Sequence, residues 1–162
     1  MDKLQTYIIN KGGILKEARV AEKVEAHEND LLHKSVHLII LCDKKVLARK
    51  RGKDESRYGG LFTSTIGTHV LLKDNYISTI EKFLPTQNLE LKFVGEFFVH
   101  DEWENEINGL FFAEVEYENL PKDFIIDREL LTVDETKEII NSGEVTPHLA
   151  GAFKMLQEKS II

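Results

Sequence analysis

The sequence has little cysteine, no long apolar run and no excess of positive charge. A single cysteine, Cys42, has no partner for an intrachain disulfide and lies in the apolar run 38–42, so we expect a reducing compartment and a cytoplasmic protein. No run approaches the roughly 18 apolar residues of a membrane span, and the N-terminal residues Met1–Gln5 lack the apolar core of a signal peptide. These absences predict a soluble chain without a membrane anchor.

The charge balance also excludes a class of partner. The formal net charge is -7, whereas a surface that binds a phosphodiester backbone needs clustered lysine and arginine. We therefore expect no nucleic-acid surface. A chain of 162 residues that is 42% apolar can bury one sizeable core but is short for two ordinary domains, which predicts a single domain over residues 1–162 of unspecified oligomeric state.

The pattern of apolar residues and turn formers predicts a mixed α/β order. Helices are expected over 20–27, over 74–84 with a stop at Pro85, over 134–141 and over 147–159, where a proline suits the first turn. Strands are expected over 6–9 and 14–16 as a hairpin, 35–42 and 46–51 as a central hairpin, and then 61–66, 91–100 and 107–117. The run 35–42 is apolar enough to be buried on both faces of a sheet.

Five side chains along the chain are suited to a divalent metal. Glu104 and Glu106 lie two apart, so on a strand they share one face, and the other three are His27, His33 and His69. Imidazole and carboxylate together suit zinc, manganese, iron or magnesium. The alternative is that these are scattered surface residues in a chain that is 30% charged. Spacing alone leaves both interpretations open.

Several sequence blocks, taken in order, resemble isopentenyl-diphosphate isomerases and their Nudix relatives. The blocks are residues 26–37, the strand and basic loop 47–53, the turn 58–70 and the glutamate pair 104–106, with a weaker echo at Thr146-Pro147. Their shared order is more specific than any single block.

The resemblance implies a fold and a site. The implied fold is the Nudix α/β/α sandwich, a mixed sheet with helices on both faces. The implied cofactor is a divalent metal, magnesium, manganese or zinc. The implied ligands are His27, His33, His69, Glu104 and Glu106, and Glu106 also matches the acid/base glutamate of the isomerases.

The sequence departs from both parent reactions of this superfamily. Gly67 stands where the isomerases have a catalytic cysteine, so the second acid/base group of an isomerisation is missing. The Nudix hydrolase helix needs several carboxylates to hold metal ions against a diphosphate. Its positions are occupied here by Thr68, Asp74, Lys82, Phe83, Thr86 and Gln87. Neither reaction has its full set of groups.

The basic loop provides candidates for substrate binding. Arg51 matches the family's diphosphate contact, and guanidinium can bind two phosphate oxygens at once. Lys53 and Arg57 could add to this charge, and Trp103 could form a pocket wall. The alternatives are solvated loop cations and ordinary aromatic packing. The remaining histidines are expected in the core or at the surface: His37, His100 and His148.

Two functional hypotheses follow. The first is a metal-dependent enzyme, hydrolase-like or isomerase-like, that acts on a small diphosphate-containing molecule, with Glu106 as acid/base and Arg51 as phosphate anchor. The second is a catalytically inactive Nudix-fold module that binds a nucleotide, a prenyl diphosphate or a protein partner, since a fold can persist after its chemistry is lost.

Overall fold

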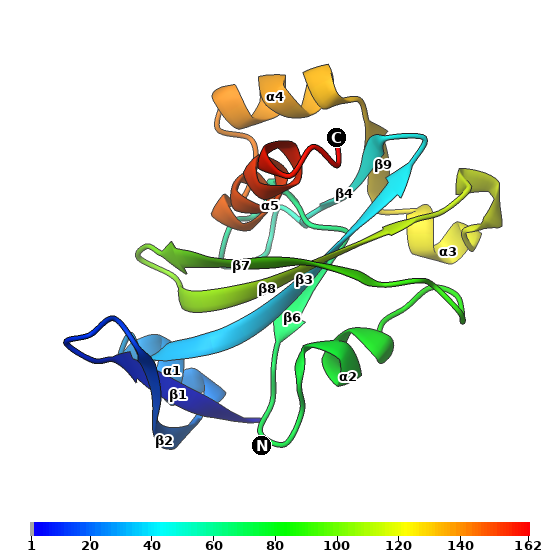
Figure 1. Ribbon diagram of the computed structural model, residues 1–162. Helices are drawn as coiled ribbons and strands as arrows, with labels where there is room; N and C mark the ends of the chain where they lie inside the picture. The colour runs from blue at the N-terminus through cyan, green and yellow to red at the C-terminus, as the bar shows by residue number, and fades with distance from the viewer. Residues whose placement is uncertain (1) are drawn as a thin grey trace.

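A mixed nine-stranded sheet forms the centre of the protein, as the computed structural model shows for residues 2–162 (Figure 1). Its strands are β1 (Lys3–Ile9), β2 (Leu15–Glu22), β3 (Leu32–Cys42), β4 (Lys45–Lys50), β5 (Phe62–Thr63), β6 (Ile66–His69), β7 (Lys92–His100), β8 (Asn105–Glu114) and β9 (Arg128–Leu131). One path runs β2-β1-β3-β4-β5, while β6 and β8 pair with β3, β7 pairs with β8, and β9 pairs with β4. The β3–β8 pair is parallel and the other strand pairs are antiparallel.

Helices cover both faces of this sheet (Figure 1). They are α1 (Lys23–Glu28), α2 (Tyr76–Glu81), α3 (Lys122–Ile125), α4 (Val133–Asn141) and α5 (Pro147–Glu158), with a short 3-10 turn at Tyr117–Asn119. Apolar residues of α4 and α5 belong to one core cluster, and those of α2 and α3 to another. The architecture is the expected α/β/α sandwich. No helix within residues 2–162 has the length and apolar character needed to cross a membrane.

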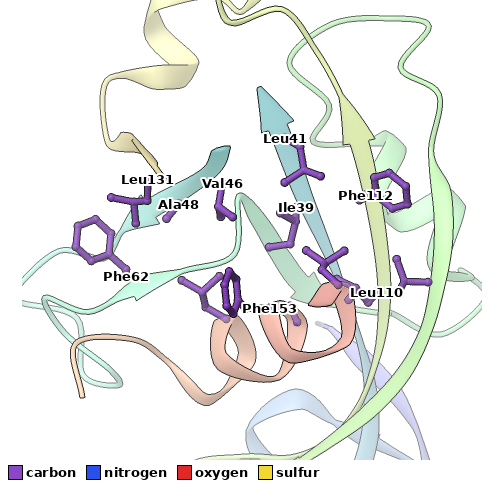
Figure 2. Packing of buried hydrophobic residues seen from close by; sticks show 13 residues of the cluster. Ile39, Leu41, Val46, Ala48, Phe62, Leu110, Phe112, Leu131 and Phe153 are labelled. Carbon is purple, nitrogen blue, oxygen red and sulfur yellow. The ribbon is translucent and has the colours of Figure 1, made fainter. Parts of the chain in front are cut away.

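The two core clusters lie on opposite faces of β3. Because side chains alternate along a strand, Ile39 and Leu41 pack toward α5, against Phe153 (Figure 2). Leu38 and Ile40 pack on the opposite face with the α2 cluster. All residues from Val36 to Cys42 are buried, which confirms that this strand is covered on both faces. The odd-numbered residues nearer the start of β3 therefore face the α5 side as well.

The structure corrects several sequence-based boundaries. The expected helix over 20–27 begins only at Lys23, because residues up to Glu22 pair with β1, where Val20 lies opposite Gln5. The expected strand 61–66 is two short strands, β5 and β6. Helix α2 ends at Glu81, before Pro85 can act as the stop. The elements α3 and β9 were not expected.

Candidate metal centre

The structure brings the five metal-type side chains together at the start of β3. His33 lies on β3 directly opposite Glu106 of β8, in the parallel register. His69 ends β6, where it pairs with Ser35 of β3. His27 reaches the same place from α1, and Glu104 from the turn just before β8. Four separate segments therefore meet at one point, and the sheet register places two of the ligand positions side by side.

The ligand atoms of this cluster are close enough to share one ion. One ligand atom from each of His27, His33, His69 and Glu104 lies within 4.8 Å of the others. The nearest pair is His27 Nε2 and His69 Nε2, 3.1 Å apart. Glu106 Oε2 lies 3.5 Å from His33 Nε2 and 3.3 Å from His69 Nε2. Two nitrogens bound to one metal at about 2.1 Å and at right angles would be separated by about 3 Å, so these spacings suit a shared ion.

Two buried atoms support this interpretation. Among residues 2–162, His33 Nε2 and Glu104 Oε2 are buried side-chain atoms without a hydrogen-bond partner, and both point into the cluster. An unsatisfied buried polar group costs free energy, typically about 1–3 kcal/mol. A cation at the centre of the cluster would satisfy both atoms, so the residues present fit a divalent metal.

The electrostatics of the cluster follow from burial and from close carboxylates. Burial, reinforced by the Arg57 guanidinium, lowers the pKa of His27 to about 4. Burial also lowers the pKa of His69. Burial opposes protonation of His33 too, but the Glu106 carboxylate outweighs it and raises the His33 pKa. His27 and His69 therefore favour the neutral form that metal ligation requires.

The two glutamates have opposite shifts. Burial and the neighbouring Glu106 raise the pKa of Glu104. Burial alone would also raise that of Glu106, but contacts with His148, His33 and His69 hold the Glu106 pKa well below its usual range. Paired carboxylates whose environments separate their pKa values are frequent at functional sites.

A pocket of about 780 Å³ opens onto the cluster. Arg51, Arg57 and Trp103 line it, whereas Lys53 is not among its lining residues. Arg51 also organises the basic loop, because its Nε donates a hydrogen bond to Arg57 O at 3.1 Å and lies 3.4 Å from Glu55. The Arg57 side chain reaches the cluster itself. Trp103 is 40% exposed, as expected for a residue at a pocket wall.

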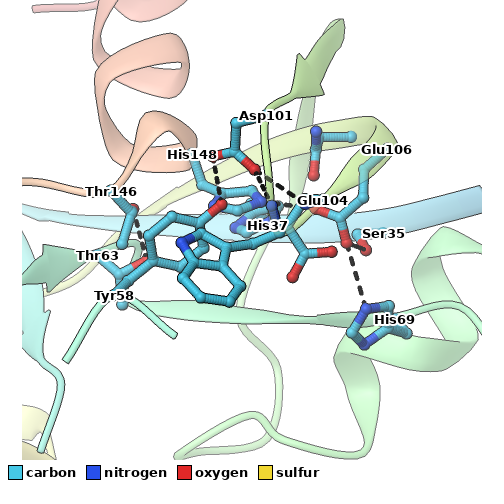
Figure 3. Close-up of polar contacts among 12 residues, drawn as sticks. Ser35, His37, Tyr58, Thr63, His69, Asp101, Glu104, Glu106, Thr146 and His148 are labelled. Atoms are coloured by element: carbon cyan, nitrogen blue, oxygen red, sulfur yellow. Dashed lines mark hydrogen bonds and ion pairs between the residues drawn. The ribbon is translucent and has the colours of Figure 1, made fainter. Parts of the chain in front are cut away.

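Sequence reasoning placed His148 in the core or at the surface and missed its position in the site. His148 is buried in the first turn of α5, and its Nε2 lies 2.6 Å from Glu106 Oε1 (Figure 3). On the other carboxylate oxygen, Ser35 donates a hydrogen bond to Glu106 Oε2 at 2.5 Å. Both oxygens of Glu106 are therefore held in place. The Thr146-Pro147 helix start was a usable signal, since it places the following histidine in the first turn of α5.

His37 is a second missed residue. It stacks on His148 with ring centroids 4.9 Å apart (Figure 3), and its Nδ1 lies 3.0 Å from Ser64 Oγ. Burial lowers the pKa of His37 to about 3, so this imidazole is neutral. The signal in the sequence was a period of two, because His33, Ser35 and His37 share one face of β3.

Gly67 lies directly opposite His37 in the β3–β6 pair. A Cβ atom at position 67 would be only 2.6 Å from Cε1 and Nδ1 of the His37 ring. The imidazole therefore fills the space that a cysteine side chain would need. A side chain at position 67, where the resemblance to the isomerases implies a cysteine, would therefore clash with His37.

Helix α2, which the sequence resemblance aligns with the Nudix hydrolase helix, contributes no described residue to this pocket. It packs through Ile80 on the opposite face of β3, and no described pocket-lining residue comes from it. Asp74 and Lys82 pair with each other at 2.6 Å. The helix therefore lies away from the metal cluster.

Most of the remaining side chains at the pocket carry a polar group. Val24 is the one aliphatic residue among its described lining residues. Charged, imidazole and hydroxyl side chains line it instead, and Thr63 and Thr146 hydrogen bond to each other at 3.0 Å (Figure 3). The hydroxyl residues at the pocket are Ser35, Ser56, Tyr58, Thr63, Ser64, Thr68 and Thr146. This lining suits a ligand rich in hydrogen-bonding groups.

Comparisons with solved structures identify the fold. The chain is similar to the protein DR0079 from Deinococcus radiodurans, with a TM-score of 0.69 and 11% identity over 94% of this chain and 98% of that one. It is also similar to a MutT protein from Methanosarcina mazei (TM-score 0.62, 12% identity, 80% and 95% covered). A third similar structure is a Nudix hydrolase from Nitrosomonas europaea (0.57, 12%, 78% and 88%). No family model and no curated protein matches the sequence. The fold is that of the Nudix hydrolases.

Proposed function

We propose that the protein is a metal-dependent, hydrolase-like enzyme that acts on a small, polar, diphosphate-containing molecule. The observation that carries this proposal is the convergence of His27, His33, His69 and the two glutamates at the wall of an open pocket. Arg51 and Arg57 line the same pocket and supply positive charge for phosphate oxygens.

Each residue of the site has a separate role in the proposed reaction. A divalent ion held by the His/Glu set would supply a Lewis acid toward a phosphoryl oxygen. Glu106, kept ionised by its three imidazole contacts, is placed to accept a proton from an attacking water. His148 and Ser35 fix the orientation of that carboxylate. Trp103 limits the pocket on the side next to the glutamates.

Two observations favour hydrolysis over isomerisation. An isomerisation needs a second acid/base group on the opposite side of the substrate, and at position 67 this place is filled by the His37 ring. A prenyl chain also needs an aliphatic wall, whereas Val24 is the one aliphatic side chain among the described residues that line this pocket.

The test begins with metal analysis of the purified protein, followed by a turnover screen of nucleoside, sugar and prenyl diphosphates with and without added metal. Glu106→Gln should remove at least about 100-fold of any activity, the usual contribution of a general base. Glu114→Gln, an exposed glutamate on the same strand, is the matched control and should retain activity. Absence of both bound and activating metal would contradict the proposal.

A second candidate function is a non-catalytic binding module. It is favoured by the position of α2, which brings no carboxylate to the pocket. A diphosphate ligand that raises the melting temperature without being turned over would support this function. Turnover that is lost in Glu106→Gln would exclude it.

A further inference from the structure

The guanidinium of Arg57 lies against two of the candidate metal ligands. Its Nη1 is 2.7 Å from His27 Nδ1 and 3.3 Å from Glu104 Oε1. The side chain of Arg57 is 33% exposed, whereas that of Glu104 is 8% exposed. Arg57 thus extends from the open pocket to the buried cluster, and it connects the two.

The contact with His27 determines where the proton of that ring lies. A guanidinium can only donate hydrogen bonds, so His27 Nδ1 is the acceptor and carries no proton. An imidazole with one unprotonated ring nitrogen is neutral. Its proton is therefore on Nε2, the nitrogen that faces His69 Nε2. A neutral imidazole has one ring lone pair to offer, and Arg57 uses it.

A metal ion that binds His27 needs the same lone pair. If the ion binds at Nδ1, it takes the position of the Arg57 hydrogen. If it binds at Nε2, the ring proton moves to Nδ1, and two donors then face each other across 2.7 Å. Through either nitrogen, His27 can serve the metal or Arg57 but not both. A cation beside Glu104 also weakens the attraction that holds the guanidinium there.

We propose that Arg57 is a metal-coupled anion-binding residue: metal binding at His27 releases its guanidinium into the pocket, where it binds an oxyanion of phosphate type. This inference rests on the metal site of the proposed function. Two hydrogen bonds hold the backbone of the loop: Arg51 Nε donates to Arg57 O, and Gly60 N donates to Gly52 O. The backbone can therefore stay in place while the Arg57 side chain rotates. Arg49 and Arg51 also line the pocket, so the released group would join two other guanidinium groups.

The first test compares metal affinities by titration calorimetry with Mn²⁺ at fixed ionic strength. Arg57→Gln should bind Mn²⁺ about tenfold more tightly than the wild type, since the metal no longer displaces a charge-assisted hydrogen bond. Arg49→Gln is the matched control, because it removes the same charge from the same pocket without touching His27 or Glu104. Equal effects of the two variants would overturn the proposal, as would an unchanged affinity in Arg57→Gln.

The second test measures the coupling between cation and anion. Sulfate binding is followed through the fluorescence of Trp103, the single tryptophan, with and without saturating Mn²⁺. In the wild type Mn²⁺ should strengthen sulfate binding several-fold, and by linkage sulfate should strengthen Mn²⁺ binding by the same factor. In Arg57→Gln this coupling should disappear. If it persists, the anion binds the metal directly and the role of Arg57 is refuted.

The two proposals fail in distinguishable ways. If neither wild type nor Arg57→Gln binds Mn²⁺, the metal centre itself is wrong. If both bind it with equal affinity, the centre stands and only the role of Arg57 falls. Thermal unfolding and circular dichroism of every variant establish that each comparison is between folded proteins.

Discussion

The contact between Gly67 and His37 gives a stability prediction that the structure makes quantitative. In Gly67→Ala the new Cβ would lie 2.6 Å from the His37 ring, about 0.8 Å closer than ordinary van der Waals contact. The ring has little room to move, because it is buried, stacked on His148 and hydrogen bonded to Ser64. Overpacking of this kind costs about 1–3 kcal/mol.

One term acts in the opposite direction. Gly67 has no positive φ, so alanine suits its backbone and restricts the unfolded chain, which contributes roughly 0.4–1 kcal/mol of stability. The net loss of unfolding free energy is then about 1–2 kcal/mol. For a chain of this size, that corresponds to a melting temperature lower by roughly 3–6 °C.

A double-mutant cycle isolates the contact. Urea unfolding of wild type, Gly67→Ala, His37→Ala and the double variant is followed by circular dichroism and Trp103 fluorescence. In the His37→Ala background, Gly67→Ala should cost nothing or stabilise slightly, which gives a coupling energy of about 2 kcal/mol. If Gly67→Ala costs the same in both backgrounds within about 0.5 kcal/mol, the steric argument is wrong.

Three further predictions concern the site and its supports. His148→Ala should weaken Mn²⁺ binding by about 10–100-fold because it frees Glu106 to rotate, measured by calorimetry against the exposed His100→Ala, which should show no change. The pKa of His37 is about 3 in the folded chain against 6.5 as its ordinary value, so between these values the unfolded chain binds a proton that the folded chain does not, and stability falls as pH drops through 6.5. His37→Asn should therefore lose about 1.4 kcal/mol less than wild type between pH 7.5 and 5.5 in urea titrations; equal losses would contradict a neutral buried imidazole. Thr132→Ala removes the hydroxyl that caps α4 by accepting from Glu135 N at 3.1 Å and should cost about 1 kcal/mol in the same assay, with Ser142→Ala near the other end of α4 as a comparison expected to cost less.

Secondary structure was predicted correctly where the hydrophobic pattern of a segment agrees with the strand pairing in the folded chain. The apolar run 35–42 predicted the buried central strand, and β3 extends over it. The helix expected over 20–27 was wrong for its first residues, because pairing with β1 overrides the local preference of residues up to Glu22. The strand β9 escaped prediction since four residues carry too little periodicity.

The residues of the candidate site were predicted from the sequence only in part. Resemblance selected the five metal-type residues, and the structure gathers them. His148 was missed because 42 residues separate it from Glu106, so no local pattern joins them. The predicted role of Arg57 as a plain substrate contact could not include its bond to His27, because that bond depends on how a loop folds over α1.

The candidate metal centre combines residues of the central β3–β8 pair with residues of a short helix and a loop, and the two groups differ in their resistance to local unfolding. His33 and Glu106 lie on strands whose backbone hydrogen bonds cross the middle of the sheet, so their amide protons should exchange only when the whole domain unfolds. His27 and Arg57 lie on a six-residue helix and a loop, segments that open locally at much lower cost. An ion at this centre would thus have rigid ligands on the sheet and a more mobile ligand on α1. It would enter and leave past His27 without disturbing the sheet.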